Sequence, residues 1–166
     1  METHIFSCVT AQDFYKQGKQ FQEAAWRCFG QKNSDNSFTT ISEQGFHQLP
    51  SPCVVNSAFA CEMFLKSMLI QLEIPYDRNK EGHSLYLLFC KLPKDKQEIL
   101  AKFCSKDLST FQILLQKHDK DFVHVRYYIE ESGWYEMSPF TMLSLGQNLS
   151  SIVGYLLSVD KSKGLL

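Results

Sequence analysis

One short polar segment of the sequence carries the residue types that can act on a phosphate group. Arg78 and Asn79 are followed by His83, with three residues between Asn79 and His83. A histidine that titrates near neutral pH can remove a proton from a hydroxyl group or return one to a leaving oxygen. An arginine can stabilise the charge that develops on a phosphate. The segment therefore carries residue types suited to proton transfer beside a phosphate.

A second interpretation of the same segment stays open. His83 precedes an apolar helical stretch, so it can simply cap that helix or pack at its beginning. Arg78 is then a solvated loop charge. Gly82 disfavours a continuous helix between the two side chains, so their separation depends on the path of a loop. Both the catalytic and the structural interpretation remain available from the sequence.

A strongly apolar helix is predicted from about Ser57 to Leu72, and it carries two charged residues. When the residues are projected at 100° each from Ala58, Glu62 falls at about 40° and Lys66 at about 80°. Both positions lie inside the apolar arc, which is formed by Ala58, Cys61, Leu65, Met68, Leu69 and Leu72. Charges in a protein core are costly unless they are paired, so each of the two needs a partner.

Two arrangements satisfy these charges. Glu62 and Lys66 are four residues apart with the glutamate first, which is the favourable order for a pair within one helix, and the lysine can also extend toward water. Alternatively, Glu62 faces a cation from another helix. Arg126 is the best candidate, because it lies in an aromatic segment and a guanidinium can bind both carboxylate oxygens. Tyr127 and Glu130 would complete that polar cluster, which is either structural or ligand-binding.

The elements that position these residues are predicted to be helices in a single all-α domain. Apolar residues recur at intervals of three and four from Ala11 to Phe29, with Thr10 and Gly30 as suitable caps. Further helices are predicted at 52–74, 84–92, 94–103, 108–115, 122–131 and 142–156, although the Val, Tyr and Ile content of 122–131 also suits a strand. Residues 31–51 form a predicted long loop, and residues 159–166 a frayed tail. The expected fold is an up-and-down bundle of four to five helices with short extra helices.

The composition limits the classes of function. The net charge is −1, so any RNA contact requires a local basic patch. The beginning of the chain lacks the features of a signal peptide, and no uninterrupted apolar run of about eighteen residues suggests a membrane span. We therefore expect a cytoplasmic protein. The six cysteines have no zinc-binding spacing, and no metal or cofactor is predicted.

Three motifs, in order, resemble the HEPN superfamily (higher eukaryote and prokaryote nucleotide-binding domains). The pattern E-x-x-x-K spans Glu62 to Lys66, and G-H-x-L-x-x-L spans 82–88. The pattern R-Y-x-x-E begins at Arg126, continues with Tyr127 and ends at Glu130. The resemblance covers about half of the chain, from Pro52 to Glu131. It implies a helical bundle that is commonly dimeric.

The resemblance also implies two kinds of function. Many HEPN proteins are metal-independent endoribonucleases of toxin–antitoxin and anti-phage systems, and their signature R-x(4–6)-H is matched here by Arg78, Asn79 and His83. In nuclease members this signature usually lies on a late helix, where Arg126 of this chain has no histidine at the required spacing. Other members bind nucleotide or RNA, or assemble with a nucleotidyltransferase or antitoxin partner. A module for binding or assembly is the first expectation, and the ribonuclease is the alternative.

Overall fold

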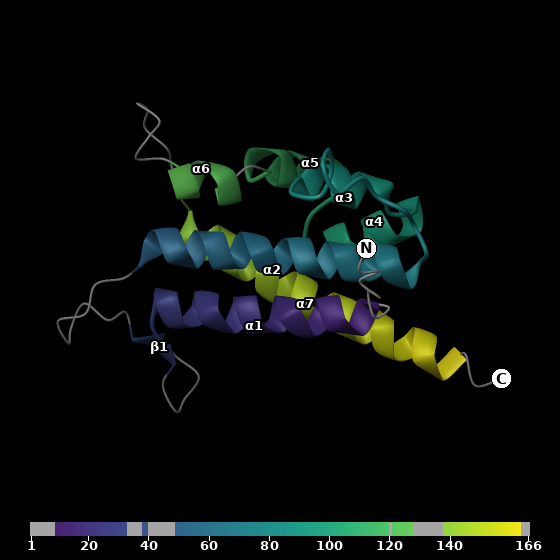
Figure 1. Ribbon diagram of the computed structural model, residues 1–166, viewed down its shortest axis with the longest axis horizontal. Helices are drawn as coiled ribbons and strands as arrows, with labels where there is room; N and C mark the ends of the chain where they lie inside the picture. The colour runs from purple at the N-terminus through teal and green to yellow at the C-terminus, as the bar shows by residue number, and fades with distance from the viewer. Residues whose placement is uncertain (1–8, 33–37, 40–48, 120, 128–137, 164–166) are drawn as a thin grey trace, which may run out of the picture.

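Helix α2 (Pro50–Gln71) lies at the centre of the protein and contacts helices on several sides (Figure 1). The structure is a computed structural model that describes residues 9–32, 38–39, 49–119, 121–127 and 138–163. Two other long helices, α1 (Ala11–Phe29) and α7 (Pro139–Lys163), pack against α2 and against each other. The shorter helices are α3 (Leu85–Lys91), α4 (Lys94–Phe103), α5 (Leu108–Lys117) and α6 (Asp121–Tyr127). The predicted all-α bundle is confirmed, with three long and four short helices in the described residues.

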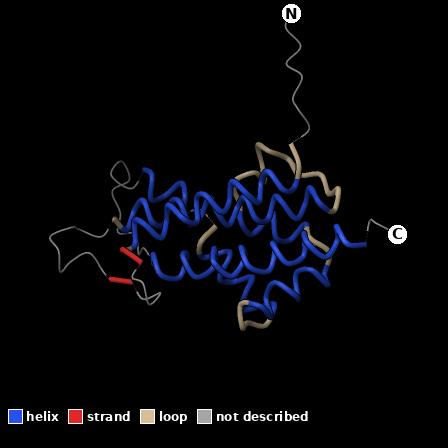
Figure 2. Tube along the Cα trace, turned by 90° about the horizontal axis from the view of Figure 1, so that it is seen from below, coloured by secondary structure: helices blue, strands red, loops and turns tan. Residues whose placement is uncertain are grey.

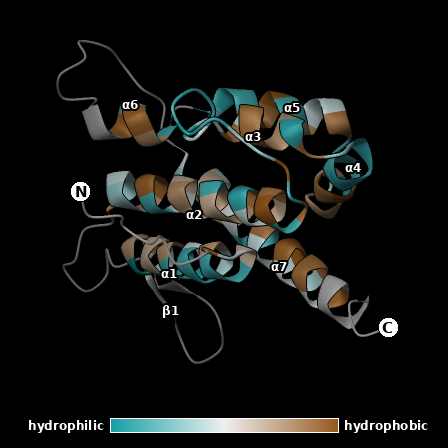
Figure 3. Ribbon diagram, turned by 45° about the vertical axis from the view of Figure 1, so that its right-hand side comes forward, coloured by the Kyte–Doolittle hydropathy of each residue, from teal (hydrophilic) through white to brown (hydrophobic). Residues whose placement is uncertain are grey.

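Helix α2 is buried on nearly all of its faces, as its sequence predicts. Its length and apolar composition would also allow it to cross a membrane, but 78% of the relevant eighteen-residue window is buried inside the protein. Figure 3 shows hydrophobic residues on α2 and α7 and many hydrophilic residues on α1. Helix α2 is therefore the core helix of the bundle, and any charge near its middle must find a partner inside the fold.

Helix α1 begins and ends where the sequence predicts. The hydroxyl group of Thr10 accepts a hydrogen bond from the backbone N–H of Asp13, and the Asp13 carboxylate accepts one from the Thr10 backbone N–H in return. This reciprocal capping satisfies two donors that the first turn of a helix leaves unpaired. Gly30 closes the helix through its N–H, which donates to the Trp26 carbonyl oxygen at 3.0 Å.

Small residues on α7 allow α1 to approach it closely. A Cβ atom at Gly146 would lie 2.1 Å from the Gln22 amide oxygen, and one at Gly154 would lie 2.4 Å from the Tyr15 hydroxyl oxygen. The Tyr15 hydroxyl group donates to the Ser150 carbonyl oxygen at 3.1 Å, between the two glycines. The spacing of these positions is four residues, so they form one stripe on α7.

The structure differs from the sequence-based prediction in the predicted loop and in the predicted tail. The predicted loop at 31–51 contains two short antiparallel strands, β1 (Gln31–Lys32) and β2 (Phe38–Thr39), drawn in red in Figure 2. Helix α2 begins at Pro50, inside the same predicted loop. Helix α7 continues to Lys163, which lies inside the segment 159–166 that was predicted to be frayed. Propensity patterns locate helix ends less well than helix interiors.

Replacement of Gly18 tests the closest contact between α1 and α2. A Cβ atom at Gly18 would lie 2.6 Å from the buried ring of Phe64. We expect Gly18→Ala to lower the free energy of unfolding by about 1–3 kcal/mol, because overpacking outweighs the gain of about 1 kcal/mol in helix propensity. Urea denaturation measures this difference. The exposed Gln17→Ala on the same helix should change stability by less than about 0.5 kcal/mol, and equal effects of the two would contradict the packing explanation.

Candidate functional site

Glu62 and Lys66 form a buried ion pair within α2. The Lys66 ammonium group donates to Glu62 Oε1 at 2.5 Å, and the two side chains are only 10% and 4% exposed, respectively. The lysine stays inside the protein, with its nitrogen 5.4 Å from the centre of the Tyr76 ring. Of the arrangements open from the sequence, the pair within one helix is present, and the ring of Tyr76 adds a cation–π contact to it.

His83 supplies the second partner of Glu62. Its Nδ1 atom lies 3.2 Å from Glu62 Oε2, while Lys66 occupies Oε1. Because an ionised carboxylate only accepts hydrogen bonds, Nδ1 must carry the proton in this contact. The His83 side chain is 61% exposed, although the Glu62 side chain is 4% exposed. The ring nitrogen Nε2 is therefore the atom that remains for a ligand or a proton.

The turn before His83 is built from hydrogen bonds among its own residues. The Asp77 backbone N–H donates to the Glu81 carboxylate at 2.7 Å, and Asp77 Oδ1 accepts from the backbone N–H groups of Asn79 and Lys80 at 2.8 and 3.3 Å. Glu81 also pairs with Lys91 of α3 at 3.0 Å. The Asp77 backbone bond and Lys91 lower the pKa of Glu81. Both carboxylates of the turn thus accept hydrogen bonds from other groups of the protein.

Gly82 allows this turn to close. A Cβ atom at Gly82 would lie 2.3 Å from the carbonyl oxygen of Arg78, a distance that no side chain can accept. The glycine that the sequence suggests as a helix breaker therefore has a second role, because it lets the backbone fold tightly between Arg78 and His83. The connection after α2 turns back along that helix, which brings His83 to the middle of α2 (Figure 1).

The three residues predicted as a catalytic set share this turn but do not form one contact cluster. Arg78, Asn79 and His83 are all exposed. Within the described part of the chain, no hydrogen bond or ion pair joins the Arg78 guanidinium to the His83 ring. Burial raises the pKa of the Tyr76 phenol. The positive charge of nearby Arg78 partly offsets this rise, and the negative charge of Glu62 adds to it.

Arg126, the predicted cationic partner of Glu62, has a side chain that the structure does not describe. Arg126 and Tyr127 belong to the end of α6, and Glu130 lies outside the described residues. Helix α6 itself packs against α2, and the ring centroids of Phe122 and Phe59 lie 4.0 Å apart. The pairing of Glu62 with Arg126 therefore stays a prediction.

Sequence reasoning missed two residues of the site. Tyr76 was part of a connection classified only as polar, and its ring covers Lys66. Asp119, in the turn after α5, binds the beginning of α3 next to His83. A pattern of apolar spacing reports only which face of a helix is buried, so contacts made by single loop residues leave no such signal.

The other titratable groups of the core have structural partners or are protonated. His118 Nδ1 lies 2.6 Å from the Asp121 carboxylate, and both side chains are buried. Burial raises the pKa of Cys53 and of Cys104 to about 11, so these free thiols are poor nucleophiles at neutral pH. In the residues that the structure describes, no group of three or more His, Cys, Asp or Glu could hold a metal ion.

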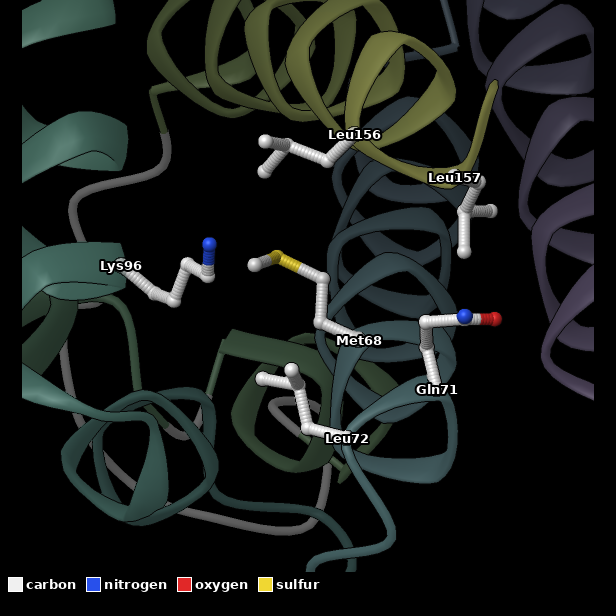
Figure 4. A pocket seen from close by; sticks show the side chains of 6 residues that line it. All are labelled: Met68, Gln71, Leu72, Lys96, Leu156 and Leu157. Carbon is white, nitrogen blue, oxygen red and sulfur yellow. The ribbon is translucent and has the colours of Figure 1, made fainter. Parts of the chain in front are cut away.

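A small pocket between α2, α4 and α7 is separate from the His83 surface (Figure 4). It is lined by Met68, Gln71, Leu72, Lys96, Leu156 and Leu157. The ammonium group of Lys96 points toward Leu156 and Met68 and lies 3.6 Å from the Asp95 carboxylate. The free space is about 10 Å³, roughly enough for one water molecule. A nucleotide does not fit there.

Comparison of the chain with protein-family models, with curated proteins and with solved structures found no match. The resemblance to the HEPN superfamily therefore rests on the three motifs of the sequence. Two of those motifs meet in space, because the glutamate of E-x-x-x-K binds the histidine of G-H-x-L-x-x-L.

The ion pair in α2 is tested by a double-mutant cycle. Lys66→Met leaves the Glu62 carboxylate buried with only His83 as a partner, and we expect it to lower the free energy of unfolding by about 3–5 kcal/mol. The double variant Glu62→Leu/Lys66→Met removes both charges and should recover most of that loss. Urea denaturation of the wild type, both single variants and the double variant measures the coupling. Additive effects would show that the two charges do not stabilise each other.

Proposed function

We propose that this protein is a HEPN-like helical module of the cytoplasm that binds a phosphate-bearing ligand, either a nucleotide or RNA. The binding surface is the exposed turn that carries Arg78, Asn79 and His83. One observation carries the proposal: the carboxylates of Asp77 and Glu81 accept hydrogen bonds within the turn and Glu81 pairs with Lys91, while Arg78, Asn79, Lys80 and His83 are exposed. Arg78, Lys80 and His83 are the exposed groups of this turn that can meet an anion.

The chemistry of the exposed groups suits a phosphate. A guanidinium donates parallel hydrogen bonds to two phosphate oxygens, and the Lys80 ammonium group adds a positive charge beside it. The Nδ1 atom of His83 faces Glu62 at 3.2 Å, so the ring offers its other nitrogen, Nε2, to a ligand. Local positive charge is what a protein with a net charge of −1 requires for contact with RNA.

The resemblance supports the setting of this module. Its implied partners are a second copy of the chain and a nucleotidyltransferase or antitoxin protein, in prokaryotic defence or a toxin–antitoxin system. The partner would act beside the His83 surface, because this is where two of the shared motifs converge.

A metal-independent endoribonuclease is the second candidate, and the Glu62–His83 contact favours it. A carboxylate that binds Nδ1 orients a histidine and leaves Nε2 to accept a proton from a 2′-hydroxyl group. Arg78 would stabilise the phosphate in the transition state. Both side chains must then reach the same phosphate, although no direct contact joins them in the described residues. The binding module requires only that each group meets some part of the ligand, which is why we place it first.

Variants of the exposed turn test the binding proposal. We expect Arg78→Ala and His83→Ala each to weaken binding of ATP or of a fluorescein-labelled single-stranded RNA by about tenfold, the effect of one lost charge-assisted hydrogen bond. Isothermal titration measures the first ligand and fluorescence anisotropy the second. Arg27→Ala is the matched control, because Arg27 is an exposed arginine of α1 that is paired with Glu23. Equal losses in Arg27→Ala and Arg78→Ala would sink the proposed site.

The ribonuclease is tested with the same proteins. If the chain is a nuclease, the wild type should shorten RNA in the presence of a metal chelator, and folded His83→Ala should leave the RNA intact. Expression of the wild type should then slow the growth of the host cells, whereas expression of His83→Ala should not. Intact RNA with a wild type that binds RNA would reject the nuclease and keep the binding module.

A further inference from the structure

His83 is exposed, so burial contributes little to fixing its ring. Among the described residues, its side chain meets Glu62 through a hydrogen bond of 3.2 Å, at the long end of the usual range, and the Phe122 ring at a centroid distance of 5.9 Å. A ring held this weakly keeps its orientation only if the backbone that carries it is fixed. The backbone groups on both sides of His83 therefore decide how well the site is ordered.

Asp119 fixes that backbone from a different part of the chain. Its carboxylate accepts the Ser84 hydroxyl group, with Oδ1 at 2.7 Å and Oδ2 at 2.9 Å, and Oδ1 also accepts the Tyr86 backbone N–H at 2.7 Å. Ser84 is the residue that follows His83 and the N-cap of α3. One aspartate thus binds the side chain of the neighbour of His83 and a backbone donor of the first helical turn.

The turn that carries Asp119 is itself held in the core. His118 and Asp121, on either side of it, are buried, and His118 Nδ1 lies 2.6 Å from the Asp121 carboxylate. The backbone N–H of His118 continues α5 by donating to the Leu114 carbonyl oxygen at 3.2 Å. Asp119 is therefore a half-buried residue that adjoins a buried contact, which is the arrangement expected for a residue that positions another.

We propose that Asp119 is a positioning residue for His83: it holds the beginning of α3 in place so that the His83 ring stays bound to Glu62 and presents Nε2 to the ligand. This proposal rests on the proposed function for the identity of the ligand. The effect of Asp119 on the His83 ring is independent of the ligand, because it can be measured in the free protein.

The experiment compares Asp119→Ala with Asp107→Ala. Asp107 caps α5 through the Thr110 backbone N–H at 2.9 Å, so its variant also loses a capping aspartate, but one with no contact to α3. Ring ¹⁵N spectra at neutral pH report which nitrogen of His83 carries the proton. The wild type should show a proton on Nδ1, and Glu62→Gln provides the spectrum of a ring without the carboxylate. Asp119→Ala should move toward that spectrum and weaken RNA binding by about tenfold.

The controls separate positioning from loss of structure. Asp107→Ala should leave the His83 spectrum and RNA binding unchanged, and Asp119→Asn, which keeps one oxygen acceptor, should restore part of the wild-type signal. A folded Asp119→Ala protein with the wild-type His83 spectrum overturns the proposal. If the alanine variant does not fold, Asp119→Asn is compared with Asp107→Asn, and identical His83 spectra overturn it. A changed spectrum in a protein whose wild type binds neither ATP nor RNA supports Asp119 and rejects the proposed function.

Discussion

The structure depends on the need to satisfy one buried carboxylate. Glu62 lies in the middle of α2, the helix that makes the largest contacts of the bundle, and the residue is 3% exposed. Transfer of an unpaired carboxylate to such a place would cost several kcal/mol. Its two oxygens therefore need two donors, and the fold supplies Lys66 from the same helix and His83 from the connection that follows it. The second donor dictates that this connection turns back along α2.

The same requirement links the core to the surface. Lys66 is satisfied inside the protein by Glu62 and by the face of the Tyr76 ring, whereas His83 reaches Glu62 from the solvent side. The path from Tyr76 to His83 is then stabilised by its own hydrogen bonds and by Lys91, which also donates to the Pro75 carbonyl oxygen at 3.0 Å. An exposed turn acquires a fixed shape because one of its side chains completes a buried network. This coupling makes the turn a better candidate site than an ordinary surface loop.

Sequence reasoning located the elements well and the contacts between them poorly. The helical periodicity placed Glu62 and Lys66 inside the apolar arc of α2, and capping chemistry gave Thr10 and Gly30, because both depend only on neighbours along one helix. The contact of Glu62 with His83 depends on a turn closed by Gly82, and that of Asp119 with Ser84 spans 35 positions of the chain. Neither has a periodic signal. The strands β1 and β2 have two residues each, too few for an alternating pattern to predict them.

Glu62 binds Lys66 with one carboxylate oxygen and His83 with the other, and this affects the chemistry that is open to His83. A carboxylate that serves one histidine alone stabilises the imidazolium ion as the ring takes up a proton. Here the charge of Glu62 is already balanced by Lys66, which holds Oε1 at 2.5 Å. The longer contact, of 3.2 Å, joins the other oxygen of Glu62 to His83 Nδ1 and orients the ring. A ring that is oriented and exposed is suited to hydrogen bonding with a ligand, while efficient proton transfer would gain from a carboxylate without a competing lysine. The internal pair of α2 thus makes Glu62 a carboxylate that is shared between a lysine and a histidine.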